Sequence, residues 1–126
     1  MSRQLTTLTI LFCVVNSIFA AEDTRPALNA EQVKFYIDQV APILVNNCFA
    51  CHGPGSSVKG ELYLGNRQDI LKGGETGPAV DLENPMDSLI IQAMLYEGME
   101  MPPKGKLPQS QIDIIDKWIT NDLKIP

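Results

Sequence analysis

The chain has 126 residues, of which 44% are hydrophobic, and a formal net charge of −5. This length suits one domain and is too short for two, and the hydrophobic content is that of an ordinary globular chain. The acidic balance excludes a nucleic-acid-binding protein, which needs a basic surface, and favours basic or neutral protein partners instead.

Residues 1–21 have the pattern of a secretory signal peptide. The basic Arg3 precedes the apolar run LTILFCVVNSIFA, which ends at the small residues Ala20 and Ala21. This run is too short and too interrupted by polar residues to predict a membrane span, and an uncleaved N-terminal anchor is the alternative. We therefore expect a periplasmic or otherwise exported protein. Its mature net charge would be −6, because cleavage removes Arg3.

The first helix is predicted over residues 29–47. Asn29, followed three positions later by Gln32, has the pattern of a capping box. Apolar residues then recur every three or four positions, which is the spacing of one buried helix face. They are Val33, Ile37, Val40 and Leu44. Pro42 is expected to kink this helix or to begin a second short one.

The middle of the chain alternates loops with short helices. Residues 53–85 are rich in glycine and proline and predict turns, with one short helix near residues 67–71. The next stretch, NPMDSLIIQAMLY, predicts a helix that Asn84 caps and that has Pro85 in its first position. We expect no paired strands anywhere in the chain.

A proline-stiffened loop and one more helix complete the domain. Pro102 and Pro103 cannot continue a helix, so EGMEMPPKGKLP is a loop. Pro108 opens a C-terminal amphipathic helix. Its apolar face carries Ile112, Ile115, Ile119 and Leu123, with Trp118 beside them. The whole pattern predicts an all-α domain of three to four helices over residues 29–126.

The stretch CFACHGPG holds two of the three cysteines and the only histidine of the chain. The spacing C-x-x-C-H, made here by Cys48, Cys51 and His52, is that of covalent attachment of a c-type haem. Two thiols at this separation can add to the two vinyl groups of the porphyrin, and the histidine can ligate the iron. Its other ring nitrogen should bond to a carbonyl, for which Pro54 and Pro78 are candidates.

Other uses of these cysteines fit the sequence less well. A structural zinc site needs a fourth ligand and usually a second paired motif, and there is no second C-x-x-C and no second histidine. A disulfide across two residues closes so short a loop that it stabilises little. A thioredoxin-type pair needs a βαβ context, which is not predicted here. A domain this small has a thin core, and a large apolar cofactor would fill it.

A single histidine leaves methionine as the main candidate for the second axial ligand. Met86 and Met94 lie on a predicted helix, where core packing explains them. Met99 and Met101 lie in the proline-stiffened loop. We favour Met101 over Met99, because the two prolines that follow it limit the entropy lost on binding iron. Lys104 is expected to be solvated or near the haem edge, and so is Lys106. Ligation by histidine and methionine raises the reduction potential and favours electron transfer.

Four stretches resemble the planctomycete-type cytochrome c domain and, more broadly, a class I cytochrome c. They are VAPILVNNCFACHGP, KGELYLGNRQDILKGGETGPAV, NPMDSLIIQAM and MPPKGKLPQSQIDIIDKWI, within residues 33–120. The resemblance implies haem thioethers at Cys48 and Cys51 and iron ligation by His52 and Met101. It also implies that the first and last helices cross near Trp118. In that family the domain often precedes further domains, so a chain ending at residue 126 is expected to be a soluble carrier.

We therefore expect a monohaem c-type cytochrome that carries single electrons between partner proteins and is not itself an enzyme. The alternative is a haem-based sensor with an open or displaceable sixth iron position. An enzyme would need a distal catalytic group, for which the candidates are Arg67, Glu97 and Glu100. Candidates for pairing with haem propionates are Lys59, Arg67 and Lys72, although ordinary solvated charges explain them equally well.

Overall fold

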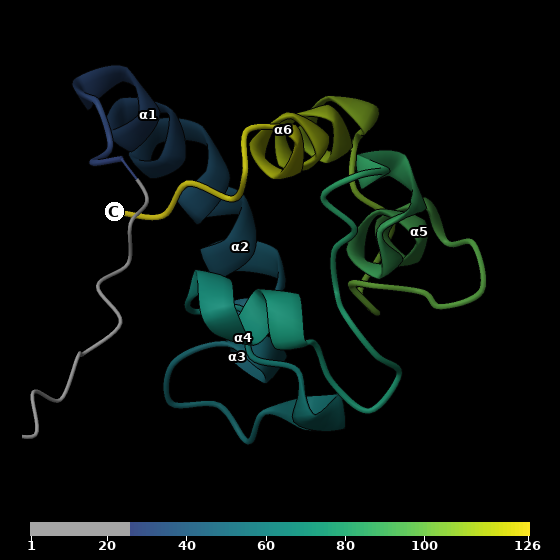
Figure 1. Cartoon of the computed structure of the whole chain (residues 1–126). Coiled ribbons are helices and arrows are strands. Elements are labelled where there is room, and N and C mark those ends of the chain that lie inside the picture. The colour runs from purple at the N-terminus through teal and green to yellow at the C-terminus, as the bar shows by residue number, and fades with distance from the viewer. Residues whose placement is uncertain (1–25) are drawn as a thin grey trace, which may run out of the picture.

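The computed structural model describes residues 26–126 and confirms an all-α domain (Figure 1). The predicted signal peptide lies outside these residues. The α-helices are α1 (Ala30–Phe35), α2 (Ala41–Asn47), α3 (Phe49–His52), α4 (Arg67–Lys72), α5 (Leu89–Leu95) and α6 (Gln109–Thr120). Shorter turns of helix are η1 (Tyr36–Val40), η2 (Lys59–Glu61) and η3 (Pro85–Asp87). Within residues 26–126 the only β-type pairing is an isolated bridge between Gly74 and Gly77.

Pro42 divides the first predicted helix, as expected. The capping box is present, since Gln32 N donates to Asn29 Oδ1 at 2.9 Å and Asn29 N donates to Gln32 Oε1 at 3.0 Å. Pro42 has no N–H, so it cannot continue the ordinary helical hydrogen-bond ladder. Just before it the chain widens into the π-helical turn η1, in which Ala41 N donates to Tyr36 O, and α2 follows. Counting α3 as well, the N-terminal half contains more short helices than predicted.

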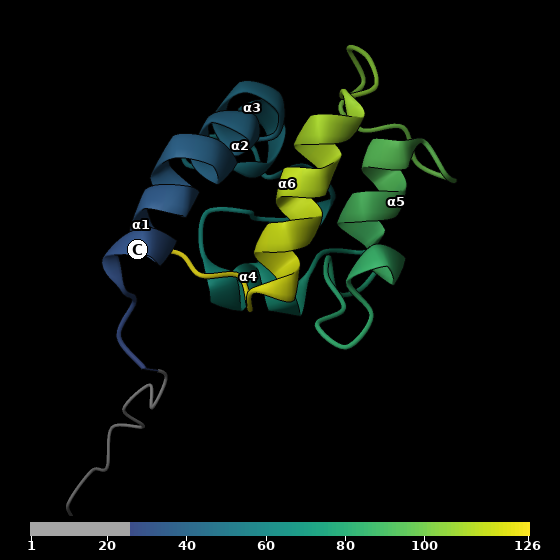
Figure 2. The same ribbon diagram turned by 90° about the horizontal axis from the view of Figure 1, so that it is seen from above.

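The C-terminal helix α6 lies between the α1–α2 arm and α5 (Figures 1 and 2). Its buried face is the predicted one, consisting of Ile112, Ile115, Trp118 and Ile119. The Trp118 ring lies 5.9 Å from that of Tyr36, centroid to centroid, so the first and last helical arms meet at Trp118 as expected. Trp118 is thus both the largest fully buried side chain and a link between the two ends of the chain.

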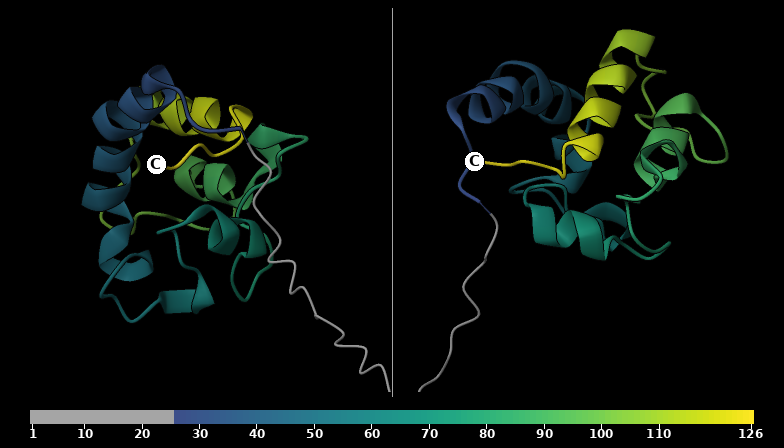
Figure 3. Two further views of the ribbon diagram at one scale, coloured as in Figure 1. Left: turned by 60° about the vertical axis from the view of Figure 1, so that its left-hand side comes forward. Right: turned by 45° about the horizontal axis from the view of Figure 1, so that its top comes forward.

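After α6 the chain turns back toward α1 (Figure 3). Leu123, the last residue of the predicted apolar face, lies beyond the helix but is completely buried. The indole Nε1 of Trp118 donates to Lys124 O at 3.0 Å and holds this return in place. Arg67 of α4 also contacts it, donating from Nε to Asp122 O at 3.2 Å. The C-terminal tail therefore joins α6 to α4.

The helix predicted from Asn84 is shorter than expected, and Asn84 does not cap it. Pro85–Asp87 form only the 3₁₀ turn η3, and the chain is extended at Ser88 before α5 begins. The cause is the buried Ser88 hydroxyl, which accepts a hydrogen bond from Asp81 N at 2.9 Å. Met86 lies on η3, outside α5, and is 54% exposed, so the prediction that it packs in the core is wrong. Met94, on α5, is buried as predicted.

Candidate functional site

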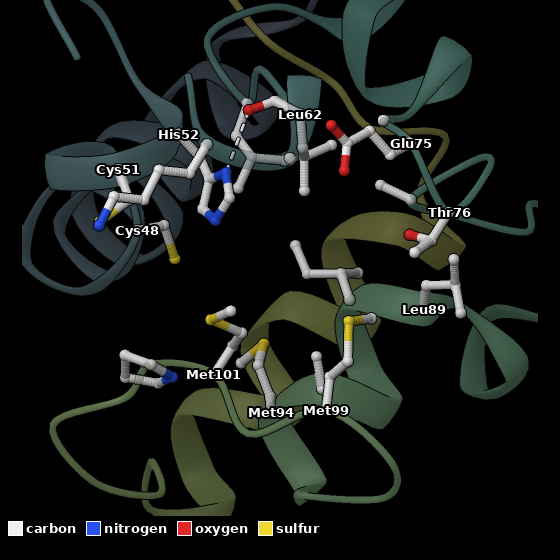
Figure 4. Close-up of a pocket in the computed structure, with 18 of the residues that line it drawn as sticks. Cys48, Cys51, His52, Leu62, Glu75, Thr76, Leu89, Met94, Met99 and Met101 are labelled. Atoms are coloured by element: carbon white, nitrogen blue, oxygen red, sulfur yellow. Dashed lines mark hydrogen bonds between the residues drawn. The ribbon is translucent and has the colours of Figure 1, made fainter. Parts of the chain in front are cut away.

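A cavity of about 400 Å³ lies between the C-x-x-C-H segment and the loop that follows α5 (Figure 4). Its lining is predominantly apolar and comes from two stretches of the chain, residues 47–64 and residues 74–103. Buried members of this lining include Leu64, Ala79, Ile90, Ala93 and Met94. Cavities of this size with a few convergent polar groups are typical of cofactor sites.

Cys48, Cys51 and His52 all line this cavity. Cys48 ends α2, and α3 is the single helical turn that contains the other two residues. Both cysteines are free thiols. Burial raises the pKa of the Cys48 thiol to about 11, although the charge of Lys104 acts in the opposite direction. Cys48 is therefore protonated at neutral pH, which is unlike the activated thiolate of a redox C-x-x-C pair.

His52 is oriented by one backbone carbonyl. Its Nδ1 lies 3.1 Å from Leu62 O, and because a carbonyl can only accept, Nδ1 carries the proton. In the neutral imidazole Nε2 then keeps its lone pair, and the ring points into the cavity (Figure 4). Leu64, two residues after Leu62, also holds the backbone of His52, since Leu64 N donates to His52 O at 2.7 Å. The carbonyl partner of His52 is therefore that of Leu62, and the two carbonyls predicted as candidates from the sequence, those of Pro54 and Pro78, are not used.

The turn that brings Leu62 to His52 depends on backbone conformations that the sequence does not reveal. Val58, Gly60 and Glu61 all have positive φ, at 49°, 63° and 55°. Together they reverse the chain, so that residues 62–64 run back beside α3. Only Gly60 could have signalled a turn of this kind.

Three methionines, Met94, Met99 and Met101, line the wall opposite the motif (Figure 4). In that view the Met101 side chain extends toward His52, whereas the other two lie farther along the wall. Met94 is 3% exposed and belongs to the core, while Met99 and Met101 are 38% and 40% exposed. The structure therefore gathers Cys48, Cys51, His52 and Met101 around one cavity, and it also brings Met99 there.

The charged candidates separate into two groups. Lys59 lines the cavity, and so does Glu75, which the sequence reasoning missed. Arg67 does not line it, since its guanidinium pairs with the Asp122 carboxylate. The exposed side chains of Lys72, Glu97 and Glu100 do not line the cavity either. The Lys104 ammonium donates to Asn46 O at 2.7 Å, and Lys106 is exposed.

Glu75 belongs to a tight backbone turn that forms part of the cavity wall. Gly74 and Gly77 exchange two hydrogen bonds of 3.0 Å, and Glu75 N donates to Gly60 O at 2.9 Å. The signal in the sequence was GGETG, a run of glycines that marks close backbone approach.

The residues of this cavity fit a haem better than a bare metal ion. Within residues 26–126, no three His, Cys, Asp or Glu side chains converge on a point where they could hold a metal. A flat apolar macrocycle instead needs apolar walls, two free thiols at one edge and one free imidazole nitrogen. Cys48, Cys51 and His52 supply these groups, and Met101 extends from the opposite wall.

A comparison with protein families agrees with this chemistry. Residues 48–105 match the family model described as planctomycete cytochrome C, which confirms the resemblance seen in the sequence. The matched stretch begins at Cys48 and includes both walls of the cavity. No curated protein and no solved structure matches the chain significantly.

Proposed function

We propose that this chain, whose residues 48–105 belong to the planctomycete cytochrome C family, is an exported monohaem cytochrome that carries single electrons between partner proteins. The observation that supports this most is one cavity lined by Cys48, Cys51, His52 and Met101. The sequence has one histidine and one C-x-x-C-H motif, which is enough for one haem. When bound, the haem supplies a one-electron iron couple, and the protein controls its surroundings.

The two thiols are suited to forming thioether links. Addition of a thiol to a vinyl group makes one C–S bond and transfers the thiol hydrogen to the vinyl carbon, so it needs no oxidant. Cys48 and Cys51 are both present as free thiols on the cavity wall. Burial keeps Cys48 protonated, with a pKa of about 11, and thereby disfavours its premature loss to a disulfide.

His52 and Met101 would hold the iron of the bound haem. The Leu62 carbonyl, 3.1 Å from His52 Nδ1, fixes the imidazole orientation and increases the basicity of the ligating nitrogen. With His52 and Met101 both as ligands, substrates would be kept from the metal. This arrangement favours electron transfer over oxygen or peroxide chemistry. The apolar lining excludes water and so also helps to set the potential.

The alternative is a haem-based sensor in which an external ligand displaces Met101. One observation favours considering it, because Met101 lies on a loop and is 40% exposed. The two functions differ only in how firmly that thioether is held.

The absorption spectrum separates these functions. The exported protein would be matured with a haem-attachment system and extracted with acidified organic solvent to remove non-covalent haem. We expect colour to remain on the polypeptide, and the oxidised protein to show the weak far-red band of methionine–iron ligation. Met101→Ala should lose this band, and the matched variant Met99→Ala should keep it.

Each departure from this result has a defined meaning. Covalent haem without the far-red band would favour the sensor. Loss of the band in Met99→Ala but not in Met101→Ala would identify Met99 as the ligand. A correctly exported but colourless protein would exclude both haem functions.

Export is part of the proposal and is supported by the signal-peptide pattern of residues 1–21. N-terminal sequencing of the mature protein is expected to begin just after Ala20 or Ala21; a start at the initiator methionine would contradict cleavage. Among residues 26–126, no helix is long and apolar enough to cross a membrane.

A further inference from the structure

The loop that carries Met101 is tied at its base to the end of α5. Met101 N donates to Ala93 O at 3.0 Å, so the loop leaves α5 and returns to it within a few residues. Tyr96, the residue that caps α5, adds a second tie because its hydroxyl donates to Pro102 O at 2.6 Å. The peptide on the C-terminal side of Met101 is therefore held by a side chain from the helix below it.

Tyr96 adopts an unusual backbone conformation to make this contact. Its φ of 66° and ψ of 34° are left-handed, a region that a bulky residue enters at a cost. Tyr96 N donates to Ala93 O at 3.2 Å, and Glu97 N donates to Gln92 O at 2.9 Å, so the turn itself is fully bonded. A glycine or asparagine would satisfy the same turn without strain. The tyrosine side chain supplies what those residues cannot, which is the phenolic donor to Pro102.

Lys104 ties the same loop to the opposite side of the cavity. Its ammonium donates to Asn46 O at 2.7 Å, in the last turn of α2 and two residues before Cys48. Lys104 and Asn46 are 58 positions apart in the sequence. The link joins the Met101 loop directly to the helix that leads into the haem-attachment motif. The link also places the Lys104 ammonium close enough to Cys48 for its charge to lower the pKa of that thiol.

Met101 has few other restraints. Its side chain is 40% exposed, and Pro102 and Pro103 have no N–H to anchor the loop through the backbone. The loop is also held by the buried Pro102 ring and by Gly105 N, which donates to Pro102 O at 3.2 Å, but both of these contacts lie after Met101. The ties to the helices on the two sides of the cavity are the Met101 amide, the Tyr96 hydroxyl and the Lys104 ammonium.

We propose that Tyr96 and Lys104 are positioning residues that hold the Met101 loop across the cavity and so keep the sixth iron position closed. This inference rests on the proposed haem function and deepens it. Tyr96 fixes the loop against α5, and Lys104 fixes it against α2. Without both ties Met101 is displaceable by external ligands, and the carrier acquires the behaviour of a ligand-binding haem protein.

The test uses side-chain changes that remove only the donors. Tyr96→Phe deletes one hydroxyl, Lys104→Met deletes one ammonium, and the double variant deletes both. The matched controls are Lys106→Met, an exposed lysine on the same loop, and Tyr63→Phe, a partly buried tyrosine outside the cavity lining. Lys104→Arg restores a charged donor and serves as the rescue variant.

The first measurement is the affinity of the oxidised, haem-loaded protein for imidazole, together with the far-red band. We expect the double variant to bind imidazole about tenfold more tightly than the parent protein and to show a weaker band, since each lost hydrogen bond removes part of the restraint. The single variants should be intermediate. Lys104→Arg and both controls should behave as the parent protein. Unchanged imidazole affinity in a folded double variant would overturn the proposal.

The second measurement is hydrogen exchange at the Met101 amide, which does not depend on the chemistry of the iron. We expect exchange to be about tenfold faster in the double variant while amides of α6 stay protected, which separates loop release from general unfolding. If the parent protein retained no haem, the proposed function would fail, and this exchange comparison would still decide the role of Tyr96 and Lys104. Equal exchange at Met101 in the two proteins would refute that role.

Discussion

Gly73 and Gly77 approach each other more closely than any side chain would permit. Gly73 ends α4 with φ 76° and ψ −160°, and a Cβ built there would lie 1.9 Å from Gly77 O. The reciprocal hydrogen bonds between Gly74 and Gly77 continue this contact into the cavity wall that carries Glu75. The wall is thus made of backbone packed on backbone, which only glycine allows.

Gly73→Ala should therefore damage both stability and the site. We expect a loss of about 3 kcal/mol in the free energy of unfolding, because the new methyl group adds a clash with a carbonyl to an unfavourable backbone conformation. Gly55→Ala is the control, since Gly55 has a similar φ of 78° but nothing within 4 Å of its Cβ position. It should lose about 1 kcal/mol, the cost of the conformation alone. Urea unfolding of both variants measures the difference, and equal losses would contradict the clash.

At the scale of elements, α4 is joined to the C-terminal tail by one ionic cluster. The Asp122 carboxylate pairs with the Arg67 guanidinium and lies 3.1 Å from the Lys124 ammonium. Partial burial acts to raise the pKa of Asp122, but hydrogen bonds and charges from Arg67 and Lys124 outweigh it, and the net pKa is lowered. A lowered folded-state pKa means that ionised Asp122 stabilises the fold.

The sign of this effect gives a pH-dependent prediction. The contribution of Asp122 is fully present above its ordinary pKa of 3.8 and is lost as the pH falls through the lower folded-state value. We expect Asp122→Asn to cost about 1 kcal/mol at pH 6, because the cluster is partly exposed, and less at pH 2, where the carboxylate is being protonated. Asparagine tolerates the left-handed φ of 63° at this position.

Urea unfolding at the two pH values tests this dependence. Asp113→Asn, on the exposed part of α6, should show no comparable change with pH. A constant cost for Asp122→Asn at both pH values would mean that the carboxylate charge is not what holds the tail.

At the scale of the whole molecule, what the sequence revealed depended on how local each feature is. Cys48, Cys51 and His52 were readable because their spacing along the chain already defines their geometry on one helical turn. The apolar face of α6 was readable for the same reason. The family match then confirmed the domain type, while the roles of the four site residues stay predictions.

Features that depend on tertiary contacts were not readable. Leu62 reaches His52 only because three residues of the preceding turn have positive φ, and two of these three residues are not glycine. Ser88 shortens the helix before α5 by bonding to Asp81, a contact that no local pattern indicates. Tyr96 and Lys104 act on Met101 through carbonyls, whose positions depend on the folded backbone.

The two sides of the cavity differ in how they are attached to the rest of the molecule. Helices α5 and α6 pack on each other, and α6 also packs on η1 through Trp118. In contrast, α4 and η2 share few contacts with the other helices. The segment that contains them is held by Ile70 and Leu64, which are buried in the core, and by hydrogen bonds of Arg67, of Leu64 N to His52 O and of the glycine turn.

We therefore expect hydrogen exchange to differ between these two parts. In haem-free protein the amides of α6 should stay protected, whereas those of residues 59–77 should exchange faster than the α6 amides and become more protected once haem is attached. Uniform protection of both parts without haem would contradict this expectation.

This unequal attachment implies an order of assembly. The helical frame of α1, α2, α5 and α6 can form while the segment 59–77 still stands open, because the frame has its own contacts around Trp118. If haem is attached as proposed, we expect Cys48 and Cys51 to be linked to it while this segment is open. The glycine turn would then close beside the linked cofactor, so that maturation of the site and completion of the fold would coincide.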